Sequence, residues 1–136
     1  MENAPCARLD DPALGWKRAY SGGGFLDIHD RFGGEDGLVY FGTRIVAAQD
    51  GDWNFLLGRD GAASVYVDGK LVICAPRRIN PAIPDRDAGL AHLTKGMHEV
   101  MVVFDTDHGF GWGIFLRFEA PRNQRKTNPV FPEVTT

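Results

Sequence analysis

The stretch Ser64–Cys74, which reads SVYVDGKLVIC, decides the fold of this chain. Two runs rich in β-branched and apolar residues, Ser64–Val67 and Lys70–Cys74, flank the pair Asp68-Gly69. A two-residue hairpin turn of type I′ needs a positive φ angle at both central residues, and Asp-Gly is one of the sequences that adopt it most readily. The stretch therefore predicts a β-hairpin.

Short strand-like segments lie on both sides of this hairpin, separated by Gly, Asp and Pro residues that favour turns. Several of them alternate between apolar and polar residues, which is the pattern of a strand with one buried face. No long segment shows the periodicity and capping residues of a helix. Besides the hairpin, the expected strands are Trp16–Tyr20, Phe25–Ile28, Leu38–Ala47, Trp53–Leu57, Leu90–Leu93, His98–Phe104 and Trp112–Phe118.

These strands predict an all-β fold, an antiparallel β-sandwich of jelly-roll-like type. Parallel strands need long crossover connections, usually helices, and the sequence offers none. About nine short strands in a chain of 136 residues are typical of one sandwich or barrel domain. We expect an N-terminal arm over residues 1–14, the sandwich over 15–120, and a C-terminal tail over 121–136 that is either a linker or a strap on the surface.

Composition and charge argue against several kinds of partner and leave the compartment open. The formal net charge is -3, so we expect no broad basic surface for nucleic acid. No apolar run approaches the roughly 20 residues of a membrane span. The start, Met1–Pro5, lacks a signal-peptide pattern, which suits a cytoplasmic protein or a module cut from a longer chain. A module of a secreted enzyme would be extracellular or periplasmic. Cys6 and Cys74 allow one disulfide, although the apolar run before Cys74 favours a buried thiol.

A series of motifs follows one order from Gly37 to Phe118. An aromatic strand comes first, then a Gly/Asp turn, the hairpin, a Lys-Gly turn, a Val-rich strand and a Gly-rich segment with Trp. This order resembles β-sandwich modules attached to carbohydrate-active enzymes, and it is similar to the protective-antigen-like lectin domains and related jelly-roll modules of glycosidases. The segments that carry the resemblance are Val39–Thr43, Leu57–Gly61, Val65–Val72, Leu93–Gly96, Val100–Phe104 and Gly111–Phe115.

The resemblance implies a sugar ligand and makes calcium a candidate cofactor. In protective-antigen-like lectins, two adjacent aspartates in the turn before the hairpin often hold calcium. At that point this chain has Arg59-Asp60, so a cation replaces one of the two carboxylates. Arg59 and Asp60 remain candidate ligand-binding residues because their turn is expected to join the rim of the site.

The segment Asp105–Trp112 is the richest candidate site because it joins two expected strands and combines carboxylates, an imidazole and aromatic rings. Sugars pack their C–H faces on aromatic rings, and their hydroxyls bond to carboxylates and amides. Two other interpretations stay open: Trp112 alternates in phase with Ile114 and Leu116 and would then be a core residue, and carboxylates with an imidazole could bind a metal ion. The candidate ligand-binding residues of this segment are Asp105, Asp107, His108, Phe110 and Trp112.

A second candidate region is the long proline-containing loop Ala75–Ala88, where Asp85 and Asp87 offer acceptors to a ligand. Long loops in compact domains often carry function, although a charged, solvated loop explains the same composition. Trp53 alternates with Phe55 and Leu57, which favours a core position over a binding platform.

Together these features favour a non-catalytic carbohydrate-binding module that targets a polysaccharide-acting protein to its glycan, as part of a larger multidomain chain. The sequence has no nucleophile elbow, phosphate-binding glycine loop or zinc-protease motif, so we expect no catalytic residue. Two alternatives stay open. One is a structural or assembly domain that binds a protein partner or its own copy. The other is a small jelly-roll lyase or hydrolase.

Overall fold

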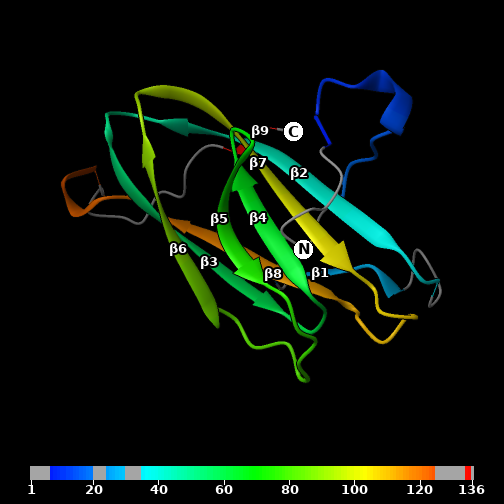
Figure 1. Cartoon of the computed structure of the whole chain (residues 1–136). Helices are drawn as coiled ribbons and strands as arrows, with labels where there is room; N and C mark the ends of the chain where they lie inside the picture. Colours follow the sequence, from blue (N-terminus) through cyan, green and yellow to red (C-terminus); the bar gives the residue numbers. More distant parts are fainter. Residues whose placement is uncertain (1–6, 20–23, 30–34, 125–133, 136) are drawn as a thin grey trace.

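The computed structural model describes residues 7–19, 24–29, 35–124 and 134–135. Within them the chain forms two facing antiparallel β-sheets, so the all-β sandwich expected from the sequence is confirmed (Figure 1). The four-stranded sheet has the order β1 (Phe25–Asp27), β8 (Gly113–Glu119), β3 (Gly51–Arg59) and β6 (Asp87–Leu93). The five-stranded sheet has the order β5 (Lys70–Ala75), β4 (Ala63–Val67), β7 (Gly96–Asp105), β2 (Leu38–Ala47) and β9 (Val134–Thr135). Two short 3-10 helices, η1 (Pro12–Leu14) and η2 (Arg122–Gln124), flank the strands.

The expected hairpin is present as β4 and β5. Asp68 and Gly69 have φ angles of 50° and 80°, so both turn residues adopt the left-handed conformation that the turn requires. Val67 pairs with Lys70 across the turn, and a bulge follows between Val65 and Tyr66. The prediction made from this stretch is confirmed.

The Asp68 side chain also fixes the hairpin turn to strand β7. Its carboxylate accepts the Glu99 backbone N–H at 2.9 Å and lies 2.6 Å from Nδ1 of His98. Nε2 of His98 lies 2.6 Å from the Thr94 carbonyl oxygen, so both ring nitrogens face acceptors. Burial alone would lower the pKa of His98, but the bonds to Asp68 and Thr94 and the charge of Asp68 outweigh it, and the pKa is raised above its ordinary value of 6.5.

The core lies between the sheets and follows the period-two pattern of the sequence. From β3, Trp53, Phe55 and Leu57 point inward with exposures of 3%, 0% and 0%, so the core position expected for Trp53 is confirmed. Val102 and Phe104 of β7 face them and are fully buried. Burial of such side chains, at roughly 25 cal/mol per Å² of apolar surface, is the main force that holds the two sheets together.

Described residues near each end of the chain contact the five-stranded sheet. Leu9, in the N-terminal arm, packs beside Met101 of β7 in the space that Gly42 of β2 leaves because it has no side chain. Strand β9, in the C-terminal tail, pairs with Arg44 and Ile45 of β2 and covers that sheet edge. The domain boundaries themselves remain predictions, and a disulfide at Cys6 lies outside the described residues.

One expected strand, Trp16–Tyr20, is wrong over its described part: residues 16–19 are not in a strand. Gly15, with φ 60°, ends η1 and turns the chain, and the Trp16 indole N–H donates to the Arg8 carbonyl at 3.0 Å. Trp16 is therefore held by the arm itself and not by a sheet partner. Tyr20 lies outside the described residues.

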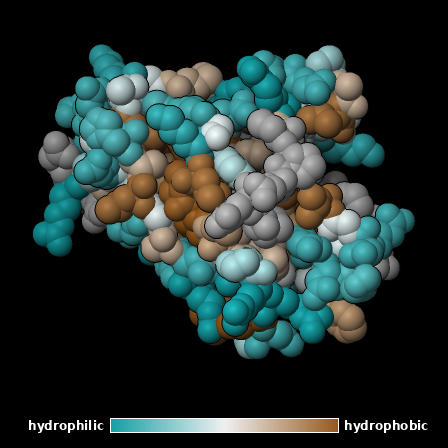
Figure 2. Space-filling model, in the orientation of Figure 1, coloured by the Kyte–Doolittle hydropathy of each residue, from teal (hydrophilic) through white to brown (hydrophobic). Residues whose placement is uncertain are grey.

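The visible surface is mostly hydrophilic, as expected for strands that turn one face towards solvent. In the view of Figure 2, hydrophilic residues cover most of the visible face, and the largest group of hydrophobic residues lies left of its centre, with smaller groups nearer the edges. Among the described residues, no helix has the length and hydrophobicity to cross a membrane.

Candidate functional site

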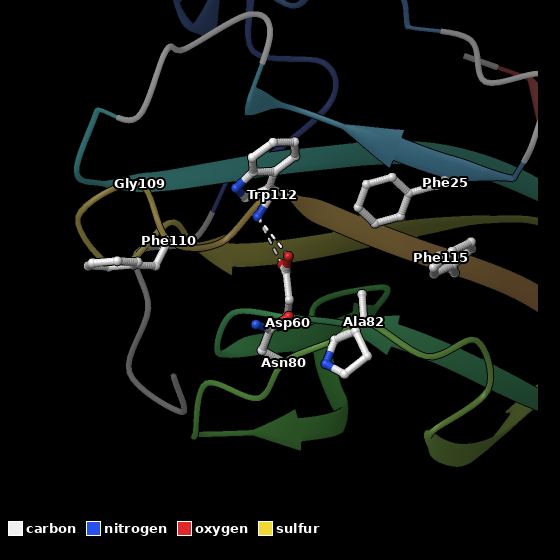
Figure 3. Close-up of a pocket in the computed structure, with 9 residues that line it drawn as sticks. Phe25, Asp60, Asn80, Ala82, Gly109, Phe110, Trp112 and Phe115 are labelled. Atoms are coloured by element: carbon white, nitrogen blue, oxygen red, sulfur yellow. Dashed lines mark hydrogen bonds between the residues drawn. The ribbon is translucent and has the colours of Figure 1, made fainter.

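An open pocket of about 570 Å³ lies at the β1 side of the four-stranded sheet. Two connections border it: the loop of residues 76–86 between β5 and β6, and the loop of residues 106–112 between β7 and β8. Figure 3 shows Asp60 between Trp112 on one side and Asn80 and Ala82 on the other. The lining residues are Phe25, Asp60, Asn80, Pro81, Ala82, Gly109, Phe110, Trp112 and Phe115.

The pocket sits on the outer face of the sheet, on an aromatic pair. Phe25 of β1 and Phe115 of β8 are register partners, and their ring centroids are 4.8 Å apart. Their neighbours Leu26 and Ile114, also register partners, pack in the core instead. Because successive residues of a strand point to opposite faces, both phenyl rings lie on the outer face, where a ligand can reach them.

The loop of residues 76–86 passes over the same outer face. A Cβ atom at Gly58 of β3 would meet the Ile83 carbonyl and Pro84, so glycine is required for this close approach. Farther along the loop, the Asp85 carboxylate pairs with both Nε and Nη2 of Arg117 at 2.8 Å. This hydrogen bonding lowers the pKa of Asp85. The loop is thus fixed to the sheet at two strands, β3 through Gly58 and β8 through Arg117.

Trp112 is not a core residue, although it alternates in phase with Ile114 in the sequence. Its exposed fraction is 48%, and its ring stacks on His29 with centroids 4.1 Å apart and planes at 11°. Strand β8 begins only at Gly113, and Trp112 is held by its backbone: its N–H donates to Asp60 and its carbonyl accepts from Ile28 at 2.8 Å. The indole therefore lies at the pocket and not between the sheets.

Phe110 is the most exposed aromatic ring of the pocket, at 67%. The Arg78 guanidinium lies over its ring, 4.8 Å from the centroid, in a cation–π contact. Arg78 also pairs with Asp107 at 3.0 Å. The two loops are thereby joined at the rim of the pocket.

Asp60 is the polar centre of the pocket and is only 8% exposed. Its carboxylate accepts the Trp112 N–H with both oxygens, at 2.9 and 3.0 Å, and the Gly113 N–H at 3.2 Å. Its backbone carbonyl accepts the Ile79 N–H at 3.1 Å. Asp60 therefore joins the end of β3 to both loops.

Arg59 lies beside Asp60 but points to the other face and is 7% exposed. Its Nε donates to the Asp87 carboxylate at 3.0 Å, and its Nη1 donates to the carbonyls of Gly61, at 3.4 Å, and Arg77. Neither Arg59 nor Asp87 lines the pocket.

Of the nine candidate residues, the structure brings Asp60, Phe110 and Trp112 together in the pocket. The other six do not line the pocket, and each of them bonds to another group of the protein. Asp105 accepts the Asp107 N–H at 2.8 Å, and His108 lies 3.2 Å from Asp36. Asp107, Asp85 and Asp87 pair with Arg78, Arg117 and Arg59 respectively.

Sequence reasoning missed Phe25, Asn80 and Phe115. For Phe115 a signal existed: it is an aromatic residue on the polar phase of an alternating strand, between Ile114 and Leu116. Asn80 offered no such signal, because its place at the pocket depends on contacts between distant segments.

The residues do not fit a calcium site of the adjacent-aspartate kind. Calcium prefers six to eight oxygen ligands. Here the carboxylate of Asp60 already accepts three hydrogen bonds from backbone N–H groups, and the position of the second aspartate carries the buried cation of Arg59. Within the described part of the chain, no three His, Cys, Asp or Glu side chains gather as a metal site, so Asp105, Asp107 and His108 do not form one either.

No protein-family model matches the sequence, and no curated protein matches it. Solved structures with a similar fold do match. A β-glucosidase from Kluyveromyces marxianus superposes with a TM-score of 0.57 and 18% identity over 72% of this chain, and the same enzyme in complex with glucose with 0.51 and 21% over 63%. The PA14 domain of the antifreeze protein MpAFP superposes with a TM-score of 0.51 and 11% identity over 74% of this chain.

These likenesses show the fold: the chain is an antiparallel β-sandwich domain like the PA14 domain of MpAFP. It spans 13% and 11% of the two β-glucosidase chains and 53% of the MpAFP chain. In the β-glucosidase, the similar sandwich is therefore a small part of a much longer chain.

Proposed function

We propose that this chain is a non-catalytic carbohydrate-binding module that targets a polysaccharide-acting protein to its glycan. One observation carries the proposal: four aromatic side chains surround a carboxylate and an amide in one open pocket. Phe25, Phe115, Phe110 and Trp112 supply the rings, and Asp60 and Asn80 supply the polar groups.

This arrangement matches the chemistry of a sugar. Its C–H faces pack on aromatic rings, and its hydroxyls donate to acceptors. A carboxylate has about four acceptor positions, and the backbone N–H groups of Trp112 and Gly113 use three bonds on Asp60, two of them on Oδ1. Oδ2 of Asp60 keeps capacity for a hydroxyl group of the ligand.

The size and openness of the pocket also suit a small part of a glycan chain. Its volume of about 570 Å³ lies in the range of small-ligand sites. Because it is open and its polar groups are few, we expect affinities of roughly micromolar to millimolar. The similar sandwich within a β-glucosidase supports a role beside a catalytic domain.

The lining of the pocket supports binding over hydrolysis. Glycosidases use two carboxyl groups about 5 to 9.5 Å apart. Among the described residues that line the pocket, Asp60 is the one carboxylate, and backbone N–H groups hold it.

The proposal is tested with a glycan array, followed by calorimetry on each glycan that binds. Phe110→Ala removes a ring that is 67% exposed, and Leu90→Ala is the matched control, since Leu90 is 71% exposed on β6, the opposite edge strand of the same sheet. We expect at least tenfold weaker binding for Phe110→Ala and wild-type binding for Leu90→Ala. A chain that binds no glycan but forms a stable dimer would favour the assembly alternative. Turnover of a bound glycan that is lost in Asp60→Asn would favour an enzyme.

A further inference from the structure

We propose that the guanidinium of Arg59 is the built-in cation of this pocket: it holds the loop of residues 76–86 in place, so the pocket forms without a metal ion. Arg59 does not line the pocket. It is therefore a positioning residue and acts through the backbone that it binds.

The partners of Arg59 come from three separate segments. They are the Gly61 carbonyl in the turn after β3, the Arg77 carbonyl at the start of the loop, and the Asp87 carboxylate at the start of β6. Carbonyl and carboxylate oxygens are also the ligands that calcium prefers. A planar guanidinium with five N–H donors can satisfy several of them at once without a metal.

The buried Arg59 guanidinium already bonds to the oxygens of Gly61, Arg77 and Asp87, so a metal ion could not use the same oxygens in its place. The Arg59 side chain is 8% exposed, and that of its partner Asp87 is 27% exposed. A buried charge is stable only when it is paired and hydrogen-bonded, and Asp87 supplies the opposite charge. At the position beside Asp60, where a calcium site of the adjacent-aspartate kind has its second carboxylate, this chain has the buried positive charge of Arg59.

The contact reaches the pocket through a short piece of backbone. Arg59 fixes the carbonyl of Arg77, and the Asp60 carbonyl fixes the N–H of Ile79. The next residue, Asn80, lines the pocket. Two adjacent residues at the end of β3 thus set the position of the loop that forms this side of the pocket.

The inference rests on the proposed function only in treating the pocket as a ligand site. Its test uses metal ions and backbone exchange, without any glycan. A failure to bind glycans would therefore leave the test intact, and a calcium-dependent pocket would leave glycan binding intact.

The first experiment uses the wild-type chain freed of metal with EDTA. Calcium chloride is titrated by calorimetry, and exchange of the Ile79 amide is followed by NMR with EDTA and with 5 mM calcium, a concentration of roughly the order that occupies weak extracellular calcium sites. We expect no saturable calcium heat and Ile79 exchange rates equal within twofold. Saturable binding together with slower Ile79 exchange in calcium would overturn the proposal.

The second experiment compares Arg59→Met with Arg59→Lys. The control is Arg122→Met, because Arg122 is an exposed arginine in η2, beside the start of β3 and away from the pocket. We expect Ile79 exchange at least tenfold faster in Arg59→Met, an intermediate rate in Arg59→Lys, and the wild-type rate in Arg122→Met. If Arg59→Met does not fold, Asp87→Asn, which removes the charge partner, should accelerate Ile79 exchange severalfold. Unchanged exchange in the folded variants would overturn the proposal.

Discussion

The carboxylate of Asp60 accepts the backbone N–H of Trp112 with both of its oxygens, at 2.9 and 3.0 Å. These two residues are 52 positions apart, at the end of β3 and at the end of the loop before β8. The contact fixes the backbone from which the indole of Trp112 extends over His29 at the pocket. One carboxylate thus serves both the fold and the candidate binding site.

Asp60→Asn should lower the free energy of unfolding by about 1–3 kcal/mol. The amide keeps the shape of the side chain, but the variant loses the negative charge and replaces an accepting oxygen with a donating NH₂ group that faces backbone N–H groups. Urea denaturation measures the change. The control is Asp52→Asn, whose exposed pair with His92 is worth roughly 0–1 kcal/mol. Equal effects of the two substitutions would contradict the role of Asp60.

The two tryptophans Trp53 and Trp112 should behave in opposite ways. Trp53→Ala should cost about 3–5 kcal/mol because the ring is buried in the core at 3% exposure. Trp112→Ala should cost about 1 kcal/mol or less, since its ring is 48% exposed, yet it should weaken glycan binding. Chemical denaturation and calorimetry on the same samples separate these effects. A large loss of stability in Trp112→Ala would mean that the indole packs in the core after all.

Gly58→Ala should destabilise the chain by about 1–3 kcal/mol and displace the loop of residues 76–86. The added methyl group would collide with the Ile83 carbonyl and Pro84. Denaturation gives the stability, and the NMR signal of the Asn80 side chain reports the displacement. Ala88→Ser is the control, because Ala88 is exposed and pairs with Leu56 on the neighbouring strand. The packing of the loop on β3 would be refuted by wild-type stability together with an unmoved Asn80 signal.

His98 should make stability depend on pH. Its pKa in the folded chain is raised, so the protonated form is favoured by folding. This contribution is fully present below the ordinary pKa of 6.5 and is lost as the pH rises through the higher folded value. The stability advantage of the wild type over His98→Gln should therefore shrink from pH 5.5 to about pH 8.5, which denaturation at several pH values would measure. If the stability advantage of the wild type over His98→Gln grew with pH, folding would not favour the protonated form of His98.

The fold could be predicted from the sequence because its determinants are local. The turn at Asp68-Gly69 and the alternation in Trp53–Leu57 each depend on neighbours within a few residues. Trp16–Tyr20 failed because Trp16 finds its partner, Arg8, within the arm. The residue types in this segment favour a strand, but strand propensity depends on context, and with this contact residues 16–19 are irregular.

The site could be predicted only in part because it is made of distant contacts. Asp85 and Asp87 were predicted as ligand groups, and that prediction stays open. Their partners Arg117 and Arg59 lie 32 and 28 positions away, and no local pattern encodes these ion pairs. The alternation of Trp112 with Ile114 and Leu116 was compatible with a core position. In the structure its backbone N–H bonds to Asp60, and Trp112 lies just before strand β8.

The central claim is that the aromatic pocket around Asp60 binds a carbohydrate, and NMR titration tests it most directly. The isotope-labelled chain is titrated with the glycan that gives the strongest signal on the array, and the shifted resonances are mapped. We predict saturable shifts that concentrate at Phe25, Asp60, Asn80, Phe110, Trp112 and Phe115. Shifts that concentrate on the outer face of the five-stranded sheet, or no saturable shift with any array glycan, would contradict the account.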